Sequence, residues 1–166
     1  DLPIIGSDPA PGSGLGRLLA MSGSGMERRL HLFVVQGIDY GGLEVVGQAG
    51  SAPGPAVVQG TSHSGIAISA IDLDSDPTIT GLASAHEIGH YLGLFHTTEQ
   101  TGVGMDPLDD TPLCGPENDA NADGYVAASE CAGLGADNVM FWSPPSGTTD
   151  LSADQEYVLV RNPLPY

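Results

Sequence analysis

The chain has 166 residues, a length that suits one domain with a sizeable core. It carries 21 acidic residues against four arginines and no lysine, and its net charge of -17 argues against nucleic acid or anionic membranes as partners. The same balance favours cations, either as bound calcium or as basic partners, although most of the carboxylates are equally explained as a solvated acidic surface.

The N-terminal half is predicted to contain a short helix and three strands. The helix is expected over residues 15–21, where Ser and Gly residues follow it. Strands are expected over 30–36, 43–47 and 65–71 because these runs are rich in β-branched and other apolar residues. A turn is expected over 39–42, and residues 50–55, rich in Gly and Pro, are expected to form a loop.

Pro77 and residues 78–80 are predicted to lead into a longer helix, with Thr78 or Thr80 as the candidate N-cap. Three carboxylates at alternate positions come just before it, in the run 72–76. They form either a calcium loop or an exposed acidic turn. The turn is favoured because no closing Glu or Gly follows at a fixed spacing.

The central motif is H-E-x-x-H-x-x-G-x-x-H, over residues 86–96. His86 and His90 are four residues apart and so share a helix face, while Gly93 is expected to end the helix. His96 then closes a set of three imidazoles. With one water they make an open catalytic zinc site, and Glu87 lies beside it as the candidate general base. The alternative is a metal-free relative that keeps the motif for its fold.

This motif resembles the signature of the metzincin metalloproteases. The family has a methionine in a tight turn beneath the zinc, and Met140, within Asn138-Val-Met-Phe-Trp142, is the matching residue. The run Asp110-Thr-Pro112 and Cys114 are similar to the pappalysin branch. The resemblance covers residues 83–145. It departs at Trp142, where pappalysins usually have a tyrosine that binds zinc or steadies the oxyanion.

The resemblance implies an α+β fold of the metzincin type. A twisted mixed β-sheet would pack on the active-site helix within an upper subdomain, residues 1–93. A loop-rich lower subdomain, residues 94–166, would hold the turn at Met140 and a C-terminal helix. The capping-box pattern of Ser152 and Gln155, which comes just before residues 156–161, independently predicts a helix there.

Two further features lie between the last histidine and Met140. An even cysteine count in a chain with a secreted-protease signature predicts one disulfide, Cys114–Cys131, with two buried free thiols as the alternative. The run 119–130 fits the calcium-loop pattern D-x-[DN]-x-[DN]-G-x₅-E. Its expected ligands are Asp119, Asn121, Asp123, Tyr125 and Glu130. The alternative is that the run forms a plain acidic turn.

The resulting expectation is a secreted zinc endopeptidase with structural calcium, which acts as a monomer on protein or peptide substrates. Two alternatives stay open. One is a zinc hydrolase of a non-peptide amide, which would need a closed pocket in place of an open groove. The other is a calcium-binding module without catalytic activity that kept the motif.

Overall fold

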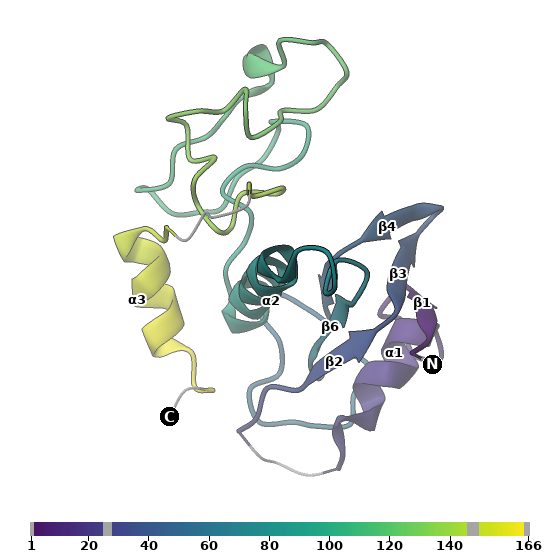
Figure 1. Ribbon diagram of the computed structural model, residues 1–166. Coiled ribbons are helices and arrows are strands. Elements are labelled where there is room, and N and C mark those ends of the chain that lie inside the picture. Colours follow the sequence, from purple (N-terminus) through teal and green to yellow (C-terminus); the bar gives the residue numbers. More distant parts are fainter. Residues whose placement is uncertain (1, 25–27, 146–149, 165–166) are drawn as a thin grey trace.

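The computed structural model describes residues 2–24, 28–145 and 150–164. They form a small α+β protein with two three-stranded sheets and three α-helices (Figure 1). The α+β class expected from the sequence is therefore confirmed. In chain order the elements are β1 (Ile4–Gly6), α1 (Gly14–Leu19), η1 (Ala20–Ser22), β2 (Leu32–Val35), β3 (Gly37–Tyr40), β4 (Leu43–Val45), β5 (Gly47–Ala49), β6 (Ile66–Ser69), α2 (Pro77–Leu92), η2 (Pro116–Asn118) and α3 (Ala153–Arg161).

The strands form two sheets where one had been expected. Their orders are β1-β3-β4 and β2-β6-β5, and each sheet combines one parallel with one antiparallel pair. Gln36 alone separates β2 from β3, and Val46 alone separates β4 from β5. The chain bends at both places and passes from one sheet to the other. The prediction of a single sheet was wrong because a bend of one residue leaves no mark in the hydrophobic pattern.

The hairpin between β3 and β4 is tighter than the sequence suggested. Gly41 and Gly42 form its two-residue loop, with φ of 63° and 94°. A two-residue loop with positive φ at both positions matches the twist of paired strands, and glycine adopts it without strain. Asp39 and Tyr40, which were expected in the turn, instead belong to β3.

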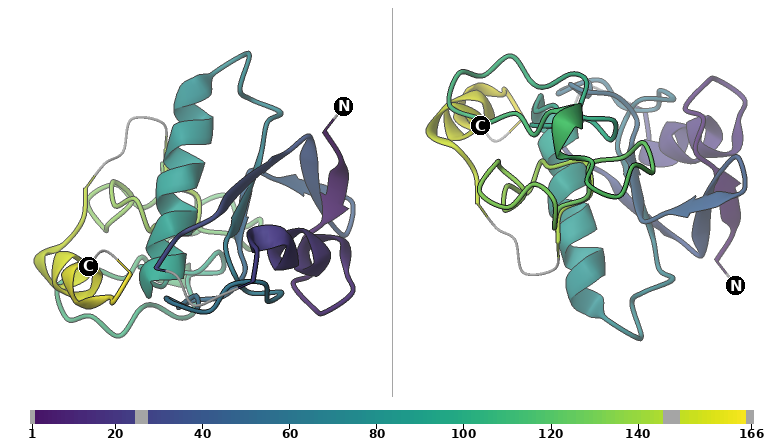
Figure 2. Two further views of the ribbon diagram at one scale, coloured as in Figure 1. Left: turned by 90° about the horizontal axis from the view of Figure 1, so that it is seen from below. Right: turned by 90° about the horizontal axis from the view of Figure 1, so that it is seen from above.

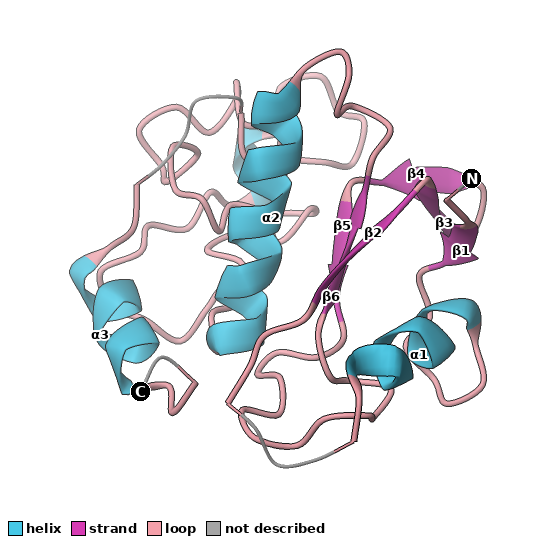
Figure 3. Ribbon diagram, turned by 60° about the horizontal axis from the view of Figure 1, so that its bottom comes forward, coloured by secondary structure: helices cyan, strands magenta, loops and turns pink. Residues whose placement is uncertain are grey.

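α1 and α2 lie on opposite faces of β6. Ile66 and Ile68 join a core cluster with Tyr91 of α2, whereas Ala67 joins a cluster with Leu15 of α1. Alternate residues of a strand point to opposite faces, so β6 is buried on both sides. Figures 2 and 3 show α2 between the strands on one side and α3 with the loop-rich segment on the other.

Both short helices predicted from the sequence are confirmed. α1 begins one residue before the expected start, and η1 continues it to Ser22. α3 begins after Ser152, whose side chain and that of Gln155 form the expected capping box. Among the described helices none is long and apolar enough to cross a membrane.

The segment between α2 and α3 is mostly loops and turns. A disulfide joins Cys114 to Cys131, as predicted, and both cysteines are fully buried. They pack with Val126 and Phe141 in a cluster of their own. This segment therefore has a separate small core, and the division into subdomains 1–93 and 94–166 stays a prediction.

Candidate metal centre

The candidate metal centre lies on α2, whose two ends are set by local interactions. Asp76 is the N-cap, and its carboxylate accepts a hydrogen bond of 3.0 Å from the N–H of Thr78. The expectation of Thr78 or Thr80 as N-cap was wrong. Pro77 suits the first helical position and keeps the residue before it extended, which places the cap at Asp76. As predicted, the helix ends at Gly93, which is left-handed with φ of 109°.

Three imidazole nitrogens converge at the C-terminal end of this helix. The Nε2 atoms of His86 and His90 each lie 3.1 Å from Nε2 of His96. Tetrahedral zinc with Zn–N bonds of 2.0–2.1 Å separates its nitrogen ligands by about 3.3 Å. The three histidines therefore fit one zinc ion. In the described part of the chain they are the one group of His, Cys, Asp or Glu side chains close enough to share a metal.

The second nitrogen of each ring is held by a hydrogen-bond acceptor. Nδ1 of His86 lies 2.7 Å from the carbonyl oxygen of Val139, and Nδ1 of His90 lies 2.9 Å from that of Leu94. Nδ1 of His96 lies 3.0 Å from Oε2 of Glu99. Because an acceptor at Nδ1 requires a proton there, all three Nε2 lone pairs are free for a metal.

Burial keeps the two helix histidines neutral. Loss of hydration, reinforced by the neighbouring His90, lowers the pKa of His86 from 6.5 to about 3. Loss of hydration also lowers the pKa of His90. A neutral imidazole is the form that binds zinc, so no proton has to be displaced from these rings at neutral pH.

Glu87 lies beside the triad and is held by β5. It is 8% exposed, and its Oε2 accepts a hydrogen bond of 2.6 Å from the N–H of Ala49. Burial raises its pKa from 4.5 to about 7, although the bond from Ala49 acts in the opposite direction. A Cβ at Gly47 would lie 2.6 Å from Cγ of Glu87, so the absent side chain makes room for the carboxylate. A buried carboxyl with a pKa near 7 is suited to exchange protons at neutral pH.

Met140 forms the floor beneath the histidines. It is fully buried, and its Sδ occupies the space next to Gly89, where a Cβ would collide with the sulfur. Gly89 lies between His86 and His90 on α2. The sulfur therefore packs on the helix backbone below both ligands.

The turn that holds Met140 is tied to the start of α3. Asn138 and Gln155 exchange two side-chain hydrogen bonds, of 2.7 and 3.2 Å, and both residues are buried. Oδ1 of Asn138 also accepts from the N–H of Met140, at 2.8 Å. These contacts, together with the bond from His86 to Val139, link α3 to one of the three candidate ligands. Sequence reasoning missed this amide pair, because its partners are 17 residues apart and neither is unusual in its own segment.

Trp142 is turned toward the loop segment. Its indole N–H donates to the carbonyl oxygen of Val126, with a distance of 2.8 Å. The ring lines the same cleft as the histidines. The N–H is therefore already occupied and is not offered to a reacting oxygen.

The expected calcium loop forms a turn of its own hydrogen bonds. The carboxylate of Asp119 accepts from the N–H groups of Asp123 and Gly124, and that of Asp123 accepts from the N–H of Tyr125. The carboxylate of Glu130 accepts from Ala120, Asn121 and Ala127. Within the described part of the chain, the carboxylates of Asp119, Asp123 and Glu130 do not lie close enough together to share one metal ion.

A cleft of about 670 Å³ runs over the triad. Its lining includes Tyr40 and Leu43 of the β3–β4 hairpin, residues of β5, and Trp142. β5 is an edge strand that pairs with β6 alone. The N–H of Gly50 and the carbonyl of Val46 form hydrogen bonds toward β6. Because the backbone groups of successive residues in a strand point to opposite sides, those of Gly47 and Ala49 point away from β6.

No protein-family model matches the chain, and no curated protein matches it.

Proposed function

We propose that the chain is a zinc-dependent endopeptidase of the metzincin type, close to the pappalysin branch. One observation carries the proposal: three Nε2 atoms converge on one point beside a buried carboxyl of pKa about 7, inside an open cleft. Zinc at this point would act as a Lewis acid and lower the pKa of a bound water to about 7.

In this proposal the protein's own groups orient the substrate and move the proton. A substrate strand lies antiparallel along β5 and pairs with the backbone groups of Gly47 that point away from β6. Glu87 takes the proton of the attacking water and then gives it to the leaving amine. Met140 supports the ligands from below and does not touch the substrate.

The shape of the cleft favours a peptide over a small amide. Gly47 and Gln48 of the edge strand β5 line the cleft, and the lining also includes the β3–β4 hairpin and Trp142. An extended chain can lie along such an edge, whereas a small amide would need a closed pocket.

Secretion and structural calcium are parts of the same proposal. The disulfide is consistent with an extracellular protein, since disulfides persist in oxidising compartments. Support for calcium comes from the loop backbone, in which Gly124 at the sixth position has φ of 90°, as the sharp turn of such a loop requires. Asp119, Asn121, Asp123 and Glu130 would turn their oxygens to the ion, and Tyr125 would offer its carbonyl.

The test is a casein digest with and without a zinc chelator. We expect the chelator to abolish cleavage and zinc to restore it. Glu87→Ala should keep zinc and lose activity by at least about 10²–10⁴-fold, the contribution of a positioned proton-transfer group. Cleavage that resists the chelator, or near-normal turnover by Glu87→Ala, would contradict the proposal.

A further inference from the structure

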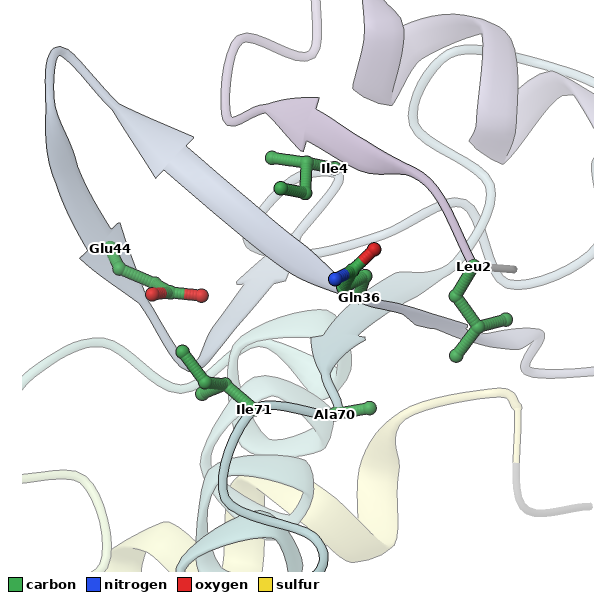
Figure 4. Close-up of a pocket in the computed structure, with 6 residues that line it drawn as sticks. All are labelled: Leu2, Ile4, Gln36, Glu44, Ala70 and Ile71. Carbon is green, nitrogen blue, oxygen red and sulfur yellow. The ribbon is translucent and has the colours of Figure 1, made fainter.

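A second hollow lies on the outer face of the β1-β3-β4 sheet. It measures about 660 Å³, and we call it the trough. Figure 4 shows its lining, with side chains from β1, from β4 and from the end of β6 bordering one space. The lining residues are Leu2, Ile4, Gln36, Glu44, Ala70 and Ile71.

Three large apolar side chains that line the trough are exposed. Ile4 is 66% exposed, Ile71 is 52% exposed and Leu2 is 47% exposed. The opposite face of the same sheet is the one that packs, because Ile5 and Ile38 join the core with α1. Exposed aliphatic side chains grouped around a hollow gain free energy when a partner covers them.

One end of the trough is acidic. Asp39 and Glu44 are direct cross-strand partners, so their side chains share a face of the sheet. The Asp39 carboxylate accepts a hydrogen bond of 2.9 Å from the N–H of Gly42, so Glu44 is the carboxylate that borders the hollow. The Glu44 carboxylate lies over Gly37, where an added Cβ would be 2.7 Å from Oε1. It is thus folded back over the sheet face that borders the hollow.

The surroundings of the trough strengthen its preference for a cation. Ile71 is followed directly by Asp72, and Asp74 lies two residues further on. No arginine is part of the lining that the structure describes. A partner with aliphatic side chains and a basic group matches both the walls and the charge.

The trough and the cleft share one lining residue. Glu44 lines both hollows. It lies in β4, which Val46 alone separates from β5, the strand beside Glu87. Glu44 is therefore the lining residue at which a chain bound in the cleft would meet the trough.

We propose that the trough binds a part of the peptide substrate remote from the cleaved bond, namely an extended segment with aliphatic side chains and an arginine or lysine. This inference rests on the proposed peptidase function and adds a second recognition site to it. Glu44 takes the basic group, while Leu2, Ile4 and Ile71 cover the aliphatic side chains. The substrate class is therefore a long, basic and apolar polypeptide.

The first test measures binding without cleavage. The full chain carrying Glu87→Gln is titrated against a fluorescein-labelled octapeptide of alternating valine and arginine, with anisotropy as the readout. Adding Ile4→Ser should weaken binding about fivefold through lost apolar contact. Adding Glu44→Gln should weaken it about two- to fivefold and reduce its salt dependence.

Two controls make this test specific. Glu117→Gln removes the same charge in η2, within the loop-rich segment, and should leave the affinity unchanged. A matched octapeptide with glutamate in place of arginine should bind at least about tenfold more weakly. Ile4 lines the trough and not the cleft. An unchanged affinity in Ile4→Ser, or no binding of the arginine peptide at all, would therefore overturn the proposal.

The second test separates the trough from the peptidase function. A short peptide that fills only the cleft is compared with the same peptide extended by the valine–arginine segment. The extension should lower KM for the wild type and not for Ile4→Ser, while both cleave the short peptide equally. If the wild type cuts neither peptide, the proposed function fails and the binding test still decides the trough. If both are cut and Ile4→Ser keeps the preference for the longer one, the trough proposal is wrong.

Discussion

Glutamine in place of Glu87 is expected to stabilise the metal-free protein at pH 8. The carboxyl is buried, and the loss of its hydration raises its pKa from 4.5 to about 7. The folded state therefore disfavours the ionised form. Glutamine has nearly the same shape, carries no charge, and keeps an oxygen that can accept the hydrogen bond from Ala49.

The size and the pH dependence of this effect follow from linkage. At 1.36 kcal/mol per pH unit, a pKa raised from 4.5 to about 7 corresponds to about 3 kcal/mol of unfolding free energy. The folded carboxyl holds its proton more tightly than the unfolded one, so the wild type loses this stability as the pH rises from 4.5 through 7. The variant should therefore be more stable by about 3 kcal/mol at pH 8, and the difference should fade toward pH 4.

Urea unfolding in the presence of a chelator measures this difference at pH 4, 6 and 8. His86, whose pKa is lowered to about 3, removes stability from both proteins as the pH falls below 6.5, so its effect cancels in the comparison. Equal unfolding free energies at pH 8 would refute the argument. A gain of the same size at every pH would refute it as well, because ionisation of Glu87 would then not be its cause.

Three other changes test separate parts of the site. Glu99→Gln should weaken zinc binding about tenfold in a competition titration. This is the lower end of the range for a hydrogen-bond partner of a metal-binding histidine, because Glu99 is 51% exposed. An unchanged affinity would show that Glu99 does not orient His96. Trp142→Phe should leave the buried carbonyl of Val126 unpaired and lower the free energy of unfolding by about 1–3 kcal/mol. It should change kcat only modestly. A loss of activity as large as that of Glu87→Ala would mean that the indole acts in catalysis. Millimolar calcium should raise the Tm relative to a solution with a calcium-selective chelator. Glu130→Ala should abolish this rise and leave the zinc content intact. The same Tm of the wild type in both solutions would identify the loop 119–130 as an acidic turn.

Features that depend on residues close in the chain could be predicted from the sequence. The spacing of His86 and His90 follows from the helix period, and the end of α2 at Gly93 follows from its left-handed backbone. The capping box of Ser152 with Gln155 likewise predicted the start of α3. The signature motif also placed His96 beside the helix ligands, and the structure brings its Nε2 to 3.1 Å from both.

Features that depend on distant partners could not be predicted in this way. The amide pair of Asn138 and Gln155 and the bond from Trp142 to Val126 join segments whose approach is set by the whole fold. The bends between β2 and β3 and between β4 and β5 could not be predicted either, because a chain that passes from one sheet to another keeps its apolar pattern. The edge strand beside the cleft, β5, is another such feature, because its contact from Ala49 to Glu87 joins residues 38 apart in the chain.

The most direct test of a zinc peptidase is a titration of zinc into the chelator-treated protein, with cleavage of a quenched fluorescent peptide as the readout. Cleavage should rise linearly and reach its plateau at one zinc per chain. Glu87→Ala should bind the same single equivalent without gaining activity. A wild-type protein that takes up one zinc and cleaves no peptide, or that cleaves equally well without zinc, would contradict the account.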